Sequence, residues 1–218
     1  MMPDNFDFHL NEFLNNWGSP TQMVRPDEGL LHRLADKVPA NLIRYWRELG
    51  FSVFKDGLML LCNPVDWKPV VDEWLEGTEL KTLDDFIPIM RGAFGDFALF
   101  GIKHGFTANL FAVEGAVMGD REFPKYSREI SISGSIGSWD PDSFDNHHYK
   151  NANFKKAFKK LGALQPNEIY GFVPMLPMGG VRDLENLQKV DAFAHLSMLR
   201  QVTGELRQIM SYADIYKN

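Results

Sequence analysis

The side chains in this sequence that are best suited to chemistry are histidines close to carboxylates. His147 and His148 are adjacent and follow Asp142 and Asp145 in a polar stretch. Imidazole and carboxylate groups bind metals and transfer protons. However, metal ligands on a helix need a spacing of three or four residues, and adjacent side chains on regular structure point apart. A hydrolase site at this pair is therefore an alternative to a plain exposed loop.

A second pair is formed by Asp191 and His195, four residues apart on a predicted helix. A carboxylate at this spacing can orient an imidazole for general-base chemistry. No serine or cysteine in a recognisable nucleophile turn accompanies the pair, so a helix-surface or packing pair is the simpler interpretation. The glycine-rich run 133–137 lacks the lysine of a nucleotide-binding loop, and we expect a twisted strand end there. We predict no catalytic residue, no metal and no cofactor.

Acidic residues are concentrated in one short part of the chain. The formal net charge is −6, and the segment 66–85 holds seven acids against two bases, Lys68 and Lys81. Such a balance disfavours a broad nucleic-acid surface, which needs a basic stripe, and it suits a basic protein partner. The alternative is an ordinary solvated surface.

We predict that two acidic patches contact a partner. The first follows the segment just described, and the second lies in the loop 140–145. The residues of the two patches are Asp72, Glu73, Glu76, Glu79, Asp84 and Asp85 in the first, and Asp140, Asp142 and Asp145 in the second.

The elements that position these acids are best defined between residues 39 and 75. Pro39 suits the start of a helix, apolar residues recur at helical spacing, and Gly50 ends it. The turn signal at residues 55–57 predicts a hairpin between strands 51–54 and 58–62. Asn63 and Pro64 then begin a second helix that reaches Leu75.

The remaining elements alternate less regularly. We expect helices at 6–17, 154–161 and about 190–202, and strands at 87–93, 97–101, 107–113 and 169–176. Ile130, Ile132 and Ile136 lie two or four apart and are consistent with one face of a further strand, and 138–150 is expected to be an exposed loop. This order predicts an α+β fold with an antiparallel or mixed central sheet and helices packed on it.

Composition limits the class of protein. The chain has 218 residues, 44% of them hydrophobic, so a large core can form without staples. Its single cysteine, Cys62, follows an apolar run and is expected to be a buried thiol. No apolar run is long enough to cross a membrane, and the N-terminal residues do not resemble a secretion signal. We therefore expect a cytoplasmic protein with no membrane contact.

Two blocks of sequence resemble known families. The run YWRELGFSVFKDGLMLLCNPVDWKPVVDEWL, followed by MRGAFGDFALFG, resembles the GAD-like domain. The run FKKAFKKLGALQPNEIYGFVPMLPMGG, followed by NLQKVDAFAHLSMLRQVTG, is similar to the C-terminal domain of immunity proteins of bacterial type VI secretion DNase effectors. On this resemblance we divide the chain into a GAD-like region, 1–101, and an immunity-protein C-terminal region, 102–218, with one compact unit formed by both regions as the alternative.

The resemblance implies an immunity protein that binds and inhibits a cognate antibacterial toxin, which would be a nuclease. It implies a toxin partner and no direct contact with nucleic acid, and it carries over no catalytic residue. A small-ligand or peptide-binding module, or a hydrolase that uses His147 and His148, remains the alternative.

Overall fold

The computed structural model describes residues 5–121, 127–146 and 152–211. Its main feature is an eight-stranded sheet in the order β1-β2-β3-β4-β5-β6-β7-β10. All neighbours in this sheet run antiparallel except β10, which joins β7 in parallel. The α+β fold with a mixed sheet is therefore confirmed.

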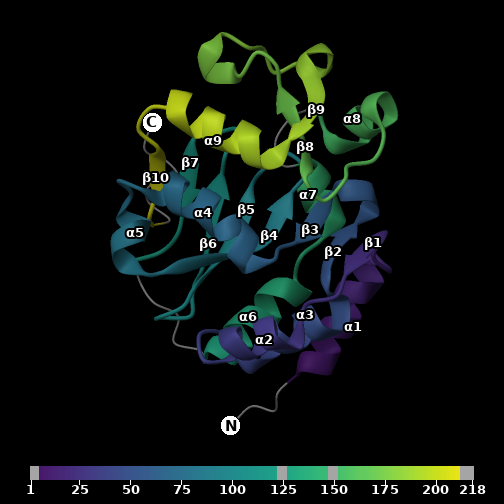
Figure 1. Cartoon of the computed structure of the whole chain (residues 1–218), viewed down its shortest axis with the longest axis vertical. Helices are drawn as coiled ribbons and strands as arrows, with labels where there is room; N and C mark the ends of the chain where they lie inside the picture. The colour runs from purple at the N-terminus through teal and green to yellow at the C-terminus, as the bar shows by residue number, and fades with distance from the viewer. Residues whose placement is uncertain (1–4, 122–126, 147–151, 212–218) are drawn as a thin grey trace.

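The sheet is built largely as a meander, so that most of its strands pair with their neighbours along the chain (Figure 1). The strands of the large sheet are β1 (Gln22–Val24), β2 (Phe51–Phe54), β3 (Met59–Leu61), β4 (Phe86–Gly92), β5 (Phe97–Gly101), β6 (Thr107–Phe111), β7 (Ala116–Met118) and β10 (Arg207–Ile209). A separate antiparallel pair consists of β8 (Glu168–Phe172) and β9 (Leu187–Asp191).

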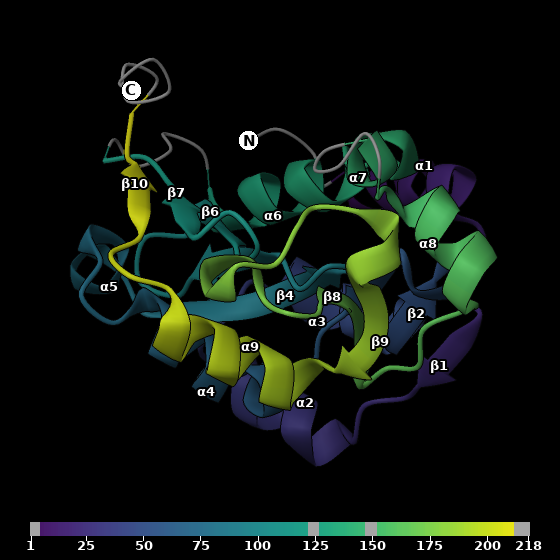
Figure 2. The same cartoon turned by 90° about the horizontal axis from the view of Figure 1, so that it is seen from above.

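Helices cover both faces of the sheet. They are α1 (Phe6–Trp17), α2 (Glu28–Ala35), α3 (Ala40–Leu49), α4 (Pro64–Leu75), α5 (Glu79–Leu83), α6 (Arg128–Gly137), α7 (Pro141–Asn146), α8 (Phe154–Leu161) and α9 (Ala192–Val202). Figure 2 shows α4 and α9 on one side of the sheet and α1, α6 and α7 on the other. Each side buries its own cluster of apolar side chains, one including Trp74 and Leu99 and the other including Trp46 and Phe100.

The expectations for residues 39–75 are confirmed in detail. The side chain of Asn63 accepts a hydrogen bond from the Val65 amide (3.1 Å) and caps α4. Gly50 ends α3 with a φ of +69°, a conformation that favours glycine. The turn between β2 and β3 forms at Lys55–Gly57. Cys62 is fully buried, and burial raises the pKa of its thiol to about 12.

The structure differs from the predictions at three places. Ile130, Ile132 and Ile136 lie on α6 and not on a strand, and the glycine-rich run 133–137 is the second half of that helix. The expected loop at 138–150 contains the short helix α7 at Pro141–Asn146. The helix expected from residue 190 begins at Ala192, because β9 occupies Leu187–Asp191.

The start of β8 is hydrogen-bonded to the large sheet and to the loop that follows β4. The buried guanidinium of Arg91, on β4, donates to the carbonyls of Pro166 (2.7 Å) and Glu168 (3.0 Å). The amide of Tyr170 donates to the carbonyl of Ala93 (2.9 Å). Burial lowers the pKa of Arg91 to about 10. Residues far apart in the sequence therefore share one hydrogen-bonded frame.

Candidate functional site

The first acidic patch is held together by its own lysines. The Lys68 ammonium lies 3.0 Å from a carboxylate oxygen of Asp72 and 2.9 Å from one of Asp85. Lys81 lies 2.7 Å from the same Asp72 oxygen. Partial burial acts to raise the pKa of Asp72, but the hydrogen bonds from Lys81 and Lys68 outweigh it and lower the pKa. Much of the charge counted in the sequence is thus offset locally.

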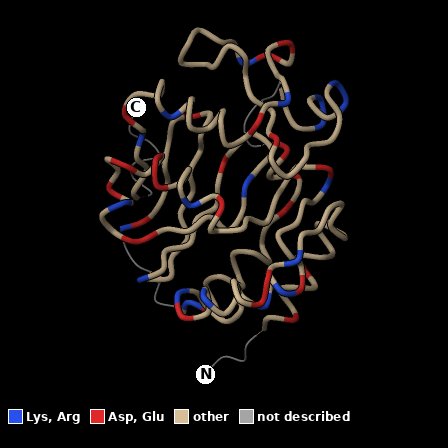
Figure 3. Tube along the Cα trace, in the orientation of Figure 1, with Lys and Arg blue, Asp and Glu red and all other residues tan. Residues whose placement is uncertain are grey.

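Two more acids of this patch have internal partners. Glu79 forms a two-pronged ion pair with Arg121, with contacts of 2.6 and 2.7 Å. The Asp84 carboxylate is buried and accepts hydrogen bonds from the amides of Lys103 (2.8 Å) and His104 (2.9 Å). Asp84 therefore shapes the turn before β6 and does not present its charge at the surface. In Figure 3, acidic and basic segments alternate over this part of the chain.

Glu73 and Glu76 have no ion pair within the described residues. They lie with Asp72 in a shallow depression that is closed on its other side by Arg200, Gln201 and Thr203. The Ser197 hydroxyl donates to Glu73 (2.8 Å). The acidic side of α4 therefore meets α9, which follows it by more than a hundred residues in the chain.

The α9 side of this depression is polar. We call the set Asp72, Glu73, Glu76, Arg200, Gln201 and Thr203 the α4–α9 surface. Helix α9 also carries the exposed apolar residues Met198 and Val202 (56% and 40% exposed), but they lie on a different flank of the helix from Ser197 and Arg200, which contact α4.

The second acidic patch is divided between surface and interior. Asp140 and Asp142 are exposed, whereas Asp145 is buried and lies 3.1 Å from the Lys155 ammonium. The Asp145 carboxylate also accepts the Lys155 amide (3.1 Å) and so links α7 to α8. Hydrogen bonds from the side chain and amide of Ser143 lower the pKa of Asp140. Asp140 and Asp142 are the two acids of this patch that reach the surface, and Asp142 lies 3.7 Å from the Lys155 ammonium there.

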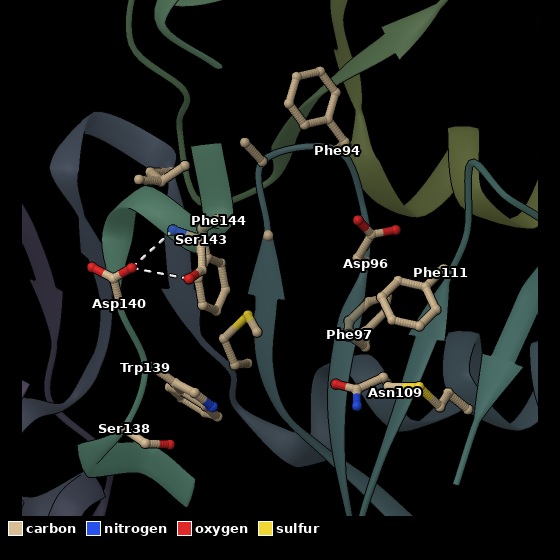
Figure 4. A pocket seen from close by; sticks show the side chains of 15 residues that line it. Phe94, Asp96, Phe97, Asn109, Phe111, Ser138, Trp139, Asp140, Ser143 and Phe144 are labelled. Atoms are coloured by element: carbon tan, nitrogen blue, oxygen red, sulfur yellow. Dashed lines mark hydrogen bonds between the residues drawn. The ribbon is translucent and has the colours of Figure 1, made fainter. Parts of the chain in front are cut away.

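A cavity of about 230 Å³ lies beside this patch (Figure 4). One wall is the segment 138–144, and the other is formed by β4, β5, β6 and β7. On β6 the side chains alternate, so that Ala108 and Leu110 are buried while Asn109 and Phe111 are partly exposed. The cavity forms where this second face of β6 is only partly covered.

The structure describes only one of the two histidine sites considered from the sequence. Asp191 does not contact His195, because its carboxylate caps α9 through the Ala194 amide (2.9 Å). His195 is 9% exposed, and burial lowers the pKa of its imidazole. His147 and His148 lie outside the described residues. Within the described residues, no group of three or more histidine, cysteine or acidic side chains is arranged to hold a metal.

Sequence reasoning missed the parts of the site that depend on tertiary contacts. Glu79 and Arg121 are 42 residues apart, and no local pattern signals their ion pair. The contribution of α9 to the α4–α9 surface likewise has no local signal. The alternation of buried and partly exposed side chains along β6 is a local signal of a strand with one half-covered face.

Among the described helices, none has both the length and the apolar composition needed to cross a membrane.

Comparisons with known proteins agree with this architecture. A search of curated proteins found no match. The crystal structure of Atu4351 from Agrobacterium tumefaciens is similar to this chain with a TM-score of 0.81 and 22% identity, covering 93% of this chain and 94% of that one. This likeness shows that the fold is shared. Residues 138–203 match the family described as T6SS immunity protein Tdi1, C-terminal, and residues 9–114 match the GAD-like domain. Two successive segments of the chain are thus similar to the GAD-like domain and to the C-terminal domain of the T6SS immunity protein Tdi1.

Proposed function

We propose that this protein is an immunity protein that binds a secreted antibacterial toxin, a nuclease, and blocks it. The observation that carries the proposal is the match of residues 138–203 to the C-terminal domain of a type VI secretion immunity protein. The fold adds support because the matched segment contains α9, which forms one side of the α4–α9 surface. An immunity protein acts by binding, and its family indicates a non-enzymatic role.

We further propose that the toxin docks on the α4–α9 surface. Glu73 and Glu76 provide charge there that is not consumed by ion pairs among the described residues, and the depression between α4 and α9 gives the surface its shape. A nuclease must present basic residues to bind phosphates, so acids at this rim attract it and speed association. Asp72, Glu79 and Asp85 contribute less because Lys68, Lys81 and Arg121 offset them. Asp140 and Asp142 form a second, smaller acidic area.

The test of function is co-expression with the toxin encoded by the neighbouring gene. We expect this chain to restore growth of cells that produce the toxin and to co-purify with it. A chain that neither binds that toxin nor restores growth would show that the proposal is wrong.

The docking surface has its own test. Glu73→Lys and Glu76→Lys should each weaken toxin binding, and the loss of affinity should be larger at low salt than at high salt. Glu48→Lys is a matched control, because Glu48 is an exposed acid near the end of α3, away from this surface. If both surface variants bind as tightly as the control, the toxin docks elsewhere while the immunity function stands.

A further inference from the structure

An apolar groove of about 300 Å³ opens near the N-terminal ends of α4 and α9. Its buried lining includes the side chains of Phe51, Leu60 and Trp67. Its exposed lining includes Val24 on the edge strand β1 and Phe193 at the start of α9, which are 56% and 45% exposed. Segments far apart in the sequence thus leave apolar surface in water around one apolar floor, which is typical of a site that another molecule covers.

The aromatic part of the groove is held rigidly from behind. The ring of Phe193 packs beside that of Trp67, with 6.2 Å between the ring centres. Trp67 in turn lies 5.8 Å from the ring of Phe97 and carries the guanidinium of Arg91 over its own ring, at 4.6 Å. A preformed aromatic surface needs little reorganisation when a partner arrives, and such surfaces receive the anchor side chains of protein interfaces.

Two acids at the groove carry charge that no ion pair offsets. The exposed Asp66 lines the groove, and its carboxylate accepts a hydrogen bond from the side-chain amide of Asn63 (2.8 Å). The exposed Asp191 accepts one from the side-chain amide of Asn167 (3.4 Å), which also lines the groove. Neither acid forms an ion pair with a described residue, so both can attract a basic residue of a partner.

The groove and the α4–α9 surface lie along the same pair of helices, which are side by side on one side of the sheet (Figure 2). Trp67 meets Phe193 near the start of both helices, and the guanidinium of Arg200 donates to the carbonyl of Glu76 (3.4 Å) near their ends. The helices therefore run in the same direction. Trp67 precedes Glu76 by nine residues, which corresponds to about 14 Å along a helix.

We propose that the groove receives a large apolar side chain of the toxin. A basic residue of the same toxin segment lies about 14 Å away at Glu76, and another basic residue close to the apolar anchor meets Asp66 or Asp191. In an extended segment this separation corresponds to about four residues. The inference rests on the proposed immunity function and adds the apolar contact that the acids of the α4–α9 surface do not supply.

The test measures affinity for the toxin encoded by the neighbouring gene. Phe193→Gln and Val24→Thr each remove apolar surface from the groove, and both side chains are exposed, so the fold should persist in both variants, which circular dichroism checks. Phe8→Gln on α1 and Val181→Thr between β8 and β9 are the matched controls. Phe8 and Val181 are 56% and 60% exposed and do not line the groove.

We expect Phe193→Gln to weaken toxin binding about tenfold and Val24→Thr about threefold, because an aromatic anchor buries more apolar surface than a methyl group. Both losses should be the same at low and high salt, whereas the loss caused by Asp66→Asn should shrink at high salt. If both groove variants bind as tightly as their controls, the groove is not a docking site while the immunity function stands. If the parent chain does not bind the toxin, the proposed function fails and this inference fails with it.

A cross-link tests the chemistry of the occupant. With p-benzoylphenylalanine in place of Phe193, ultraviolet light should link the protein to the toxin, and mass spectrometry locates the linked segment. We expect a large apolar side chain there, with a lysine or arginine about four residues away in an extended segment or about nine in a helix. A linked segment without such a basic residue would overturn the proposal. So would a parent chain that sediments as a dimer and becomes a monomer in Phe193→Gln, because the groove would then hold a second copy.

Discussion

Arg91 is a buried cation that holds one part of the chain against another. Its guanidinium donates to the carbonyls of Pro166 and Glu168 at the start of β8, and it lies over the ring of Trp67, 4.6 Å from the ring centre. Burying this charge without a paired carboxylate is costly, and the lowered pKa of the group reflects that cost. The two charge-assisted hydrogen bonds, together with the contact to the ring, offset it.

We predict that Arg91→Met lowers the free energy of unfolding by about 2 kcal/mol, because two carbonyls lose their donors. Equilibrium unfolding in urea measures the change. Arg47→Met is the control, since Arg47 pairs with Glu28 at the surface and is 49% exposed, and it should cost well under 1 kcal/mol. An unchanged stability for Arg91→Met would mean that relief of the buried charge fully compensates the lost bonds.

His195 makes the stability depend on pH. Because burial lowers its pKa, the folded protein holds this proton less tightly than the unfolded chain does. The unfolded chain therefore binds more protons as the pH falls from 7 to 5, and the folded state loses stability. One such group contributes a slope of at most about 1.4 kcal/mol per pH unit.

We expect His195→Gln to flatten the curve of unfolding free energy against pH between 7 and 5. The exposed His32 supplies the comparison, and His32→Gln should leave the slope attributable to His195 in place. Urea unfolding at four pH values measures both variants. A slope that is the same in His195→Gln and in the parent chain would contradict this account.

At the scale of elements, the sequence predicted a helix correctly where capping residues define its ends. The amide contact to Asn63 and the positive φ of Gly50 are short-range features that a sequence displays directly. Helix α6 was missed because Ile130, Ile132 and Ile136 all fit the period of two of a strand, whereas only Ile132 and Ile136 lie one helical turn apart. The structure buries the last two, which lie one turn apart, and leaves Ile130 41% exposed.

The same helix shows why tertiary context was needed. Glu129 of α6 accepts hydrogen bonds from the amides of Ala40 (2.7 Å) and Asn41 (2.9 Å). Its carboxylate thereby caps the N-terminus of α3, where it also meets the positive end of the helix dipole. These residues are almost ninety positions apart, so no window of sequence reveals the contact. The candidate site was likewise predictable only in part. The sequence identifies its acidic residues, but it does not reveal their ion pairs or the cavity, which depend on tertiary contacts.

The β2–β3 hairpin depends on a glycine for two separate reasons. Gly57 has a φ of +104°, and a Cβ added there would lie 2.5 Å from the Cβ of Leu164. Next to it, the Leu164 amide donates to the carbonyl of Asp56 (3.0 Å). The turn is thus pressed against the segment that follows α8, and any side chain must disturb both backbone and packing.

We predict that Gly57→Ala destabilises the protein by about 3 kcal/mol, the sum of backbone strain and overpacking. Gly77→Ala is the control, because Gly77 also has a positive φ, +79°, but nothing lies within 4 Å of an added Cβ. It should cost only about 1 kcal/mol. Thermal and urea unfolding of both variants give the difference, and equal losses would show that the contact with Leu164 carries no energy.

For the whole molecule, the contacts between the two matched regions lie on both faces of the sheet. The indole of Trp17 donates to the carbonyl of Trp139 (3.0 Å) on one side, and the indole of Trp74 donates to that of Leu196 (3.1 Å) on the other. Strand β10, which follows the second matched region, completes the edge of the sheet beside β7. We infer that the GAD-like region cannot retain its structure when separated from the rest of the chain.

The prediction concerns the fragment 1–101, the GAD-like region as the sequence divides it. The fragment lacks β6, β7 and β10, so β5 becomes an open edge. It also lacks α9, whose Leu196 and Leu199 share a buried cluster with Trp74 and Leu99. Exposing this much apolar surface and an unpaired edge favours aggregation over folding.

We expect the full chain to unfold in one transition that far-ultraviolet circular dichroism and tryptophan fluorescence report alike. We expect the fragment to be aggregated or to lack dispersed amide signals in NMR. Two separate transitions in the full chain, or a fragment with a cooperative transition of its own, would establish two independent folding units instead.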